Sequence, residues 1–173
     1  MYQELILDHA RHPHGRGLAE SFDGESFQVN PTCGDRIQLR VGLRAAPAPG
    51  GEPGAQPGDG GEPGALVLES VSWDGQGCSI SQASASMMKD LVEGKDLAAV
   101  EAVAGAFAEL MRSRGRGVDQ AAAESLEDAI ALEGVSRYPM RVKCALLGWM
   151  ALKDAAAKAA AGDASPARIP EGI

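Results

Sequence analysis

Aromatic side chains are scarce in this chain of 173 residues, where Phe, Trp and Tyr together make up only 4%. The core must therefore be filled by Ala, Val, Leu, Ile and Met. No apolar run approaches the roughly 18 residues that a membrane-spanning helix needs. Positive charge is also in deficit, with 16 Lys and Arg against 24 Asp and Glu. The net charge of −8 argues against nucleic acid and anionic membranes as partners, since both bind basic surfaces.

Cysteine is rare as well, because Cys33, Cys78 and Cys144 are the only three and lie far apart. An odd number cannot pair completely within one chain, and dispersed cysteines are typical of reducing compartments. The first residues show no basic segment followed by an apolar one, so we expect a cytoplasmic protein. Such cysteines are metal ligands, reactive thiols or small buried hydrophobes, and their positions alone leave these readings open.

The pattern that is present predicts a single α+β domain. Apolar and polar residues alternate strictly over residues 36–44, which indicates a strand with one buried face. We expect Val67, Val71 and Trp73 to mark one face of its hairpin partner, and a short third strand around residues 27–29. Helices follow the strands along the chain, which favours helices packed on one face of a small antiparallel sheet.

Helical periodicity predicts the remaining elements. The expected helices are Tyr2–Ala10, Ser79 to about Val92, Asp96 to about Met111, Asp119 through Leu126 and Ile130, and Pro139 to about Ala160. Ser79 and Gln82 have the spacing of a capping box. Asp96 and Asp119 are expected N-caps, and Pro139 suits a first helical turn.

A stretch rich in Pro and Gly separates the two main strands. The sequence Gly-Glu-Pro-Gly-Ala occurs twice within residues 45–65. It offers too little apolar surface to offset its ordering entropy, so we predict a flexible insertion at a hairpin tip. We expect one domain over residues 1–161 and a disordered tail over residues 162–173.

Each cysteine lies in a segment of unusual composition. Cys33 and Asp35 flank Gly34 in a turn-rich loop, so a sharp turn would aim both side chains at one point. Cys78 joins a strand to a helix, where the helix dipole favours the thiolate. Cys144 falls in the second turn of the last helix. Three thiolates and one carboxylate make a tetrahedral zinc set, although no compact Cys-x-x-Cys pair is present.

Such a set would carry excess negative charge, and Arg36, Arg141 and Lys143 are candidate cations to offset it. Arg141 precedes Cys144 by three residues, so both side chains can face the same way on a helix.

Histidine is also clustered, at His9, His12 and His14. His9 falls on a helix face, and the other two flank a proline that forms a turn. The sequence therefore favours packing and turn roles over metal ligation for these residues.

Three long motifs, in the correct order, resemble the SufU family, whose members are relatives of the U-type iron–sulfur cluster scaffolds. The motifs are Asn30–Asp35, Gly75–Met88 and Gly134–Cys144, and Asp8-His9 with Pro13 and Gly17 is similar to the N-terminal segment of that family. The resemblance covers about 30 residues closely and the order of elements across most of the chain.

The resemblance implies a SufE/NifU-like fold and a zinc ion held by Cys33, Asp35, Cys78 and Cys144. It also implies sulfur relay, in which a pyridoxal-phosphate cysteine desulfurase of the SufS type hands persulfide sulfur to this protein. The protein would then pass the sulfur to a cluster-assembly scaffold complex. We expect Cys33 to be the acceptor, because a loop beside glycine moves more easily than a helix, with Cys144 as the alternative. Arg141 is the second expected catalytic residue.

Two departures from the IscU-type scaffolds favour the SufU branch. The scaffolds carry a histidine immediately before the last cysteine, where this chain has Lys143, and they lack the segment around residues 112–135. Two other functions stay open. One is a scaffold that assembles an iron–sulfur cluster on the same cysteines, and the other is a structural zinc domain used for docking.

Overall fold

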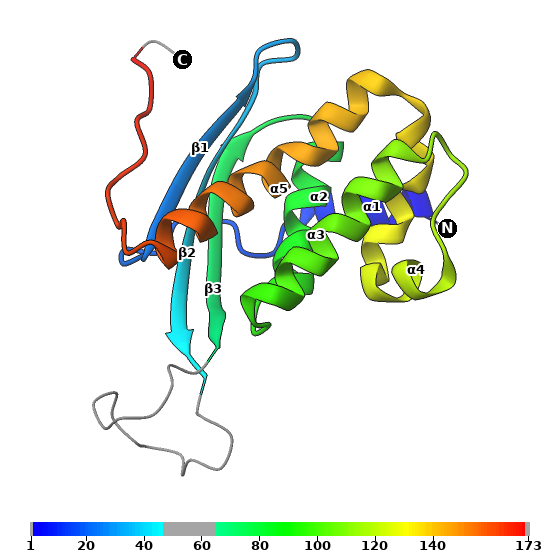
Figure 1. Cartoon of the computed structure of the whole chain (residues 1–173). Helices are drawn as coiled ribbons and strands as arrows, with labels where there is room; N and C mark the ends of the chain where they lie inside the picture. Colours follow the sequence, from blue (N-terminus) through cyan, green and yellow to red (C-terminus); the bar gives the residue numbers. More distant parts are fainter. Residues whose placement is uncertain (1, 47–64, 172–173) are drawn as a thin grey trace.

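Three antiparallel strands and the helices that cover one face of their sheet make up the fold in this computed structural model, which describes residues 2–46 and 65–171. The strands are β1 (Gly24–Asn30), β2 (Asp35–Ala45) and β3 (Leu66–Gln76), in the order β1-β2-β3. The helices are α1 (Tyr2–Arg11), α2 (Ser79–Val92), α3 (Leu97–Arg112), α4 (Gln120–Leu126), the 3₁₀ helix η1 (Glu127–Arg137) and α5 (Pro139–Ala160). Figure 1 shows α5 running diagonally across the sheet. The predicted α+β architecture is confirmed.

The central strand β2 alternates as its sequence predicts, with Ile37, Leu39 and Val41 buried against the helices. Arg36, Gln38 and Arg40 alternate with them and point to the other face of the sheet. There Arg40 lies directly opposite Glu25 of β1, and the two side chains form an ion pair.

A β-bulge changes the buried face of β3. Gly42 pairs with Ser70, but the next residue of β2 pairs with Leu68, which leaves Glu69 as an extra residue. Leu68, and not Val67, therefore joins Val71 and Trp73 in the core cluster. The predicted face is right for Val71 and Trp73 and wrong for Val67, because a bulge resets the alternation along a strand.

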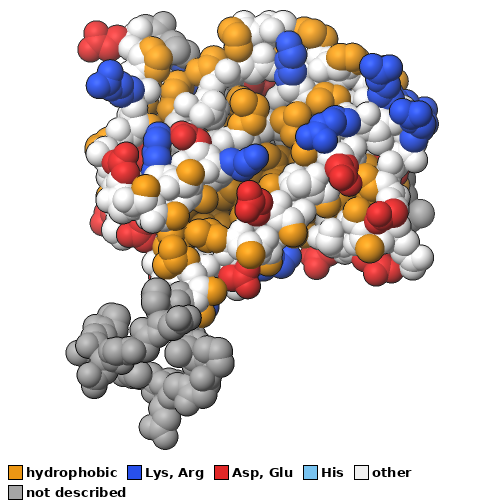
Figure 2. All heavy atoms as spheres, viewed as in Figure 1, with side chains coloured by type: hydrophobic (Ala, Val, Ile, Leu, Met, Phe, Trp, Pro, Cys, Tyr) orange, Lys and Arg blue, Asp and Glu red, His pale blue; other side chains and the backbone are white. Residues whose placement is uncertain are grey.

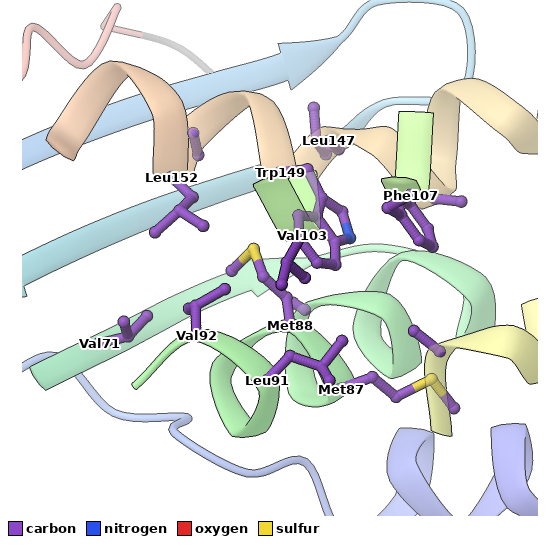
Figure 3. Close-up of a cluster of buried hydrophobic side chains, with 14 of the residues drawn as sticks. Val71, Met87, Met88, Leu91, Val92, Val103, Phe107, Leu147, Trp149 and Leu152 are labelled. Carbon is purple, nitrogen blue, oxygen red and sulfur yellow. The ribbon is translucent and has the colours of Figure 1, made fainter. Parts of the chain in front are cut away.

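The core fills the space between β3, α2, α3 and α5 (Figure 3). Trp149 of α5 stacks on Phe107 of α3, with ring centroids 4.6 Å apart. At the other end of α5, the backbone approaches β1 so closely that a Cβ atom on Gly24 would overlap the carbonyl oxygen of Ala155. Glycine at this position thus permits the contact between helix and strand.

Buried serines of α2 join that helix to its neighbours. The Ser84 hydroxyl donates to the carbonyl oxygen of Ala145 at 2.6 Å and accepts from the indole Nε1–H of Trp149 at 3.1 Å. All three groups are buried, so the indole N–H of Trp149 depends on Ser84 for its hydrogen bond.

Two of the predicted helix starts are confirmed. The side chains of Asp96 and Asp119 accept from the backbone N–H groups of Ala99 and Ala122, both at 2.8 Å. The helix expected to run from Asp119 through Ile130 instead ends at Leu126, and η1 continues the chain. The break falls where Glu127 adopts φ +45°, a backbone region that helical residues do not occupy.

The predicted capping box at α2 is wrong. The N-cap is Cys78, one residue before Ser79, and it makes no capping hydrogen bond through its side chain. Gln82 instead donates to the carbonyl oxygen of Gly77 at 2.9 Å. The box would have required Ser79 to lie outside the helix, whereas it is the first helical residue.

The predicted insertion at residues 45–65 lies almost wholly outside the described residues. Its two ends are joined by a hydrogen bond from the Ala46 N–H to the Ala65 carbonyl oxygen, at 2.9 Å. These ends stand at the far end of β2 from Asp35. A strand of 11 residues spans roughly 33 Å, so the base of the insertion is well separated from the cysteines.

The segment after α5 forms neither helix nor strand over residues 163–170, and its backbone donates a hydrogen bond to a side chain of β1. The Ala167 N–H donates to the buried Glu25 carboxylate at 2.9 Å. Figure 1 shows this segment beside β1. The predicted disorder of residues 162–173 and the domain boundary at 161 stay predictions.

Apolar side chains also gather in an open groove between α3 and α5, which holds about 250 Å³ and can be seen in Figure 2. Glu101 and Lys153 line it alongside Leu97, Val100 and several alanines. None of the described helices has the length and apolar character needed to cross a membrane.

Replacing Ser84 with alanine should destabilise the fold, because the Trp149 N–H would then be buried without a partner. We expect a loss of about 1–3 kcal/mol in the free energy of unfolding, measured by urea denaturation. The matched control is Ser125→Ala in α4, where the serine is exposed. Equal stability of the two variants would contradict the role given to Ser84.

Glu25 should make the stability depend on pH. Burial alone would raise the pKa of Glu25, but hydrogen bonds from Arg40, the Ala167 N–H and Gln38 outweigh it and hold the pKa below its usual value. A carboxyl group with a lowered folded-state pKa stabilises the protein above its unfolded pKa, about 4.3, and loses this contribution as the pH falls. Glu25→Gln should therefore lower the melting temperature at pH 7, and the gap to wild type should shrink below about pH 4. Glu20→Gln, at an exposed position, should show neither effect.

Candidate metal centre

The strand pairing brings the cysteine-bearing segments to one end of the sheet. Arg36 of β2 lies opposite Gln76 of β3, so the first residue of β2 and the residues just after β3 are neighbours. Asp35 begins β2, and Cys78 follows the end of β3 by two residues. The second turn of α5 adds Cys144 from the helical side.

A tight turn between β1 and β2 positions the first two candidate ligands. Gly34 adopts φ +74°, which glycine reaches without steric cost, and its N–H donates to the Asn30 carbonyl oxygen at 2.8 Å. The Asn30 side chain also accepts from the Thr32 N–H at 3.1 Å. The turn therefore leaves Cys33 exposed while Asp35, two residues later, is buried.

Three of the four predicted ligands converge. One donor atom each from Cys33, Asp35 and Cys144 lies within 4.8 Å of the others, and the two Sγ atoms are 3.4 Å apart. Asp35 Oδ2 is buried and has no hydrogen-bond partner among the described residues. A buried carboxylate oxygen without a partner is costly, and a bound cation would remove that cost.

Cys78 is close to these residues but lies outside the group of three. It is exposed at the N-terminus of α2 and lines the same groove as Cys33 and Cys144. The preceding residue, Gly77, packs so closely that a Cβ atom there would lie 3.2 Å from Asp35 Cγ. The Sγ atom of Cys78 is not within 4.8 Å of all three other donor atoms, so the role of Cys78 as a fourth ligand stays a prediction.

The buried thiol of Cys144 is held in its neutral form in this arrangement. Burial raises the pKa of Cys144, and interactions with Cys33, Asp35 and Cys78 raise it further. Its sulfur also contacts the carbonyl oxygen of Met140 at 3.6 Å. Four groups that all become anions on deprotonation thus crowd together, which is the electrostatic situation that a divalent cation relieves.

The donor set fits zinc. Thiolates bound tetrahedrally at about 2.3 Å lie roughly 3.8 Å apart, close to the 3.4 Å between the sulfurs of Cys33 and Cys144. A small separation of the two side chains would bring the pair to that spacing. The unpaired oxygen of Asp35 supplies the hard donor that accompanies sulfur in mixed sites.

A groove of about 910 Å³ opens in front of the cysteines. Its walls come from α1, η1 and the start of α5, and it is lined by Tyr2, Ile6, Ala131, Val135, Arg137, Tyr138, Met140 and Arg141, among others. Of the three predicted cations only Arg141 lines it, since Arg36 donates to Gln76 at 3.0 Å on the neighbouring strand and Lys143 is exposed elsewhere.

Sequence reasoning missed Tyr2, Arg137 and Tyr138 as groove residues. Tyr2 and Tyr138 are more than half exposed, at 56% and 58%, which is unusual for two of the chain's few aromatic residues. The scarcity of aromatic residues was the signal that the sequence offered for Tyr2 and Tyr138. A chain with few aromatic residues has few to place at its surface.

A three-stranded antiparallel sheet under helices, with thiols and a carboxylate gathered at one end, defines a class of small α+β proteins with a cysteine–aspartate centre. The chain belongs to the family of NifU-like N-terminal domains, which it matches over residues 1–47 and 63–159. The gap in this match falls within the predicted insertion, so the family pattern continues on both sides of it.

Curated relatives agree with this assignment and confirm the resemblance to the SufU family. The chain is 36% identical to the zinc-dependent sulfurtransferase SufU of Bacillus subtilis, with 94% of each chain covered. It is 32% identical to the iron–sulfur cluster assembly scaffold protein IscU of Streptococcus pyogenes, covering 92% of this chain and 85% of that one.

Solved structures show the same fold. A NifU-like N-terminal protein from Brucella abortus matches with a TM-score of 0.71 at 20% identity, covering 92% of this chain and 94% of that one. An iron–sulfur cluster assembly scaffold protein of the SUF system from Fervidobacterium islandicum matches with a TM-score of 0.63 at 26% identity. That match covers 88% of this chain and 93% of the other.

The three thiols should differ in reactivity once any metal is removed with a chelator under reducing conditions. We expect an alkylating reagent to modify the exposed Cys33 and Cys78 first, and Cys144 at least about tenfold more slowly because it is only 5% exposed. Peptide mass spectrometry over a time course measures the order. In urea all three should react alike, and a fast reaction of Cys144 in the folded protein would contradict the geometry.

Proposed function

We propose that this protein acts in iron–sulfur cluster assembly as a zinc-dependent sulfurtransferase. It accepts persulfide sulfur from a cysteine desulfurase and relays it to the assembly of clusters. The observation that carries this proposal is the exposed thiol of Cys33, which lies on a glycine-containing turn beside the buried Cys144 and the unpaired carboxylate of Asp35.

Cys33, Asp35, Cys78 and Cys144 would hold the zinc ion. When bound, zinc would keep the thiols deprotonated and mute their reactivity until a thiolate leaves the metal. Asp35 belongs to β2 and Cys144 to α5, so both have backbones fixed by regular hydrogen bonding. Cys78 is the N-cap of α2, and its carbonyl oxygen accepts from the Gln82 N–H at 3.2 Å. Cys33 lies in a turn that belongs to neither strand, so it is the ligand with the most freedom to move.

Cys33 is the acceptor of the sulfur. Its thiolate attacks the outer sulfur of the desulfurase persulfide, so a new S–S bond forms to Cys33 while the S–S bond within the partner breaks. The partner cysteine leaves as a thiolate, and the transferred sulfur stays on Cys33 as a persulfide. The exposure of Cys33 favours it over Cys144, which is buried.

Arg141 assists by its positive charge. It is exposed in the groove, and its guanidinium carbon lies 5.8 Å from the ring centroid of Tyr138. Arg141 takes part in none of the ion pairs found among the described residues, so its charge is available to anionic sulfur. It would stabilise the thiolate of Cys33 before attack and the persulfide after it.

The partner that supplies the sulfur is a pyridoxal-phosphate cysteine desulfurase of the SufS type, and a cluster-assembly scaffold complex receives it. The groove of about 910 Å³ gives a persulfide-bearing segment of the partner room to reach Cys33. Three free thiols require a reducing compartment, so we place the reaction in the cytoplasm.

A scaffold that builds an iron–sulfur cluster on the same cysteines is the second candidate, and the IscU protein of Streptococcus pyogenes favours it through its 32% identity. A scaffold would hold the iron–sulfur cluster by its cysteine thiolates and carry it to another protein. Two features favour the sulfurtransferase. Lys143 replaces the histidine of the scaffolds, and the additional segment around residues 112–135 supplies Ala131, Gly134 and Val135 to the groove wall.

Reaction with a persulfidated desulfurase tests the proposal. Protein as purified should carry about one zinc ion per chain, and mass spectrometry after the reaction should find one added sulfur, mapped to Cys33. Cys33→Ala should abolish the stimulation of desulfurase turnover. Arg141→Ala keeps every ligand, so it should slow transfer severalfold while the zinc content is unchanged.

Two controls sharpen the result. Asp35→Ala weakens zinc binding but removes no sulfur nucleophile, so it should still gain sulfur on Cys33. Sulfur found only on Cys144, in wild type and Cys33→Ala alike, would overturn the assignment of the acceptor. If no cysteine gains sulfur and anaerobic reconstitution yields a stable cluster with charge-transfer absorption, the protein is a scaffold.

A further inference from the structure

A second cluster of metal-binding side chains lies away from the cysteines. One ring nitrogen each of His9 and His14 and a carboxylate oxygen of Asp90 all lie within 4.8 Å of one another. His9 belongs to the last turn of α1, His14 to the loop after it and Asp90 to the C-terminal part of α2. Asp90 lies twelve positions after Cys78, or about 18 Å along the helix axis, so the two groups are independent.

One buried hydroxyl group fixes both histidines. Ser86 Oγ lies 2.7 Å from Nδ1 of His9 and accepts the backbone N–H of His14 at 2.8 Å. His9 is only 4% exposed and Ser86 is fully buried, so the His9 ring is held in place. Hydrogen bonds to a histidine ring fix its orientation, as the partners of metal-bound histidines do.

The outer side of the cluster is open. The side chains of His14 and Asp90 are 50% and 40% exposed, and His14 Nδ1 lies 2.5 Å from Asp90 Oδ2. Both can rotate about their outer bonds to bring their donor atoms to the spacing that an ion needs. Water can reach this side and complete the coordination.

Two carboxylates lie beside the histidines. Asp128 Oδ2 lies 3.6 Å from Nε2 of His9, which adds a second carboxylate near the cluster. Lys89, the neighbour of Asp90 in α2, pairs with Glu93 at 3.3 Å and not with Asp90. A cation bound between the histidines and Asp90 would therefore meet attraction from two carboxylates.

We propose that His9, His14 and Asp90 form a second metal site, which takes a divalent transition ion such as Zn²⁺, Co²⁺ or Ni²⁺. Two imidazoles and one carboxylate suit these ions, whereas Mg²⁺ and Ca²⁺ prefer oxygen donors alone. The site contains no thiol, so it differs in chemistry from the cysteine–aspartate centre.

The ion would tie three segments together. His9 anchors α1, whose first residues Tyr2 and Ile6 line the groove in front of the cysteines. Asp90 belongs to α2, which begins beside Cys78. Binding would therefore fix one wall of the groove relative to the helix that carries a candidate ligand, and its direct effect is to stabilise the fold by mass action.

Titration with Co²⁺ tests the second site. Protein carrying its purified metal is dialysed against increasing Co²⁺, and bound metal is counted by elemental analysis while absorption is recorded. We expect one further equivalent that brings no sulfur-to-cobalt charge-transfer band, together with a rise in melting temperature. His14→Gln and Asp90→Asn, both at exposed positions, should each weaken this equivalent about tenfold or more.

His12→Gln is the matched control, because His12 lies two residues from His14 but, within the described part of the chain, pairs only with Asp8, at 3.3 Å on the surface. It should bind the further equivalent as wild type does. The proposal fails if wild type binds no further equivalent, or if both His14→Gln and Asp90→Asn retain it. It also fails if His12→Gln loses it equally, since that result describes loose binding to surface histidines. Cys33→Ser removes a ligand of the first centre only, so the further equivalent must persist there, whatever the outcome for sulfur transfer.

Discussion

The pairing of β2 with β3 is the constraint on which the rest of the centre depends. Because Arg36 lies opposite Gln76, the turn that carries Cys33, the first residue of β2 and the N-terminus of α2 must all meet at one end of the sheet. The same pairing places the base of the 45–65 segment at the other end. The pairing of β2 with β3 thus brings Cys33, Asp35 and Cys78 to one end of the sheet. The helix α5 must then pack against that end to add Cys144.

The serines of α2 form hydrogen bonds with several neighbouring segments of the chain. Ser84 bonds to α5, Ser86 holds both histidines of the N-terminal segment, and Ser81 donates to the Cys78 carbonyl oxygen at 3.0 Å. The Ser84 hydroxyl is the partner of the buried indole N–H of Trp149, and the Ser86 hydroxyl accepts the backbone N–H of His14. The small-residue helix α2 is therefore also the polar connection between α1, α2 and α5.

Local signals in the sequence predicted much of the fold. The alternation around Leu39, the cap at Asp96 and the proline that begins α5 each act within a few residues, so the chain reveals them directly. The bulge at Glu69 and the break at Glu127 could not be predicted, because they depend on pairing and packing with distant residues. The same holds for the site. Gly34 indicated the turn between Cys33 and Asp35. The contact between His14 and Asp90 joins residues 76 positions apart, so it leaves no local pattern in the sequence.

Cys33 and Cys144 are separated by 111 positions, and this distance has a consequence for how the protein is made. During synthesis the β1–β2 turn leaves the ribosome long before α5 does, so the donor set stays incomplete until nearly the whole chain has emerged. A chain broken off before α5 has Asp35 and two thiols but lacks the third. An ion that needs donors from both ends of this long loop binds the folded chain and stabilises only the finished molecule, by mass action. Metal occupancy would then distinguish completed molecules from fragments.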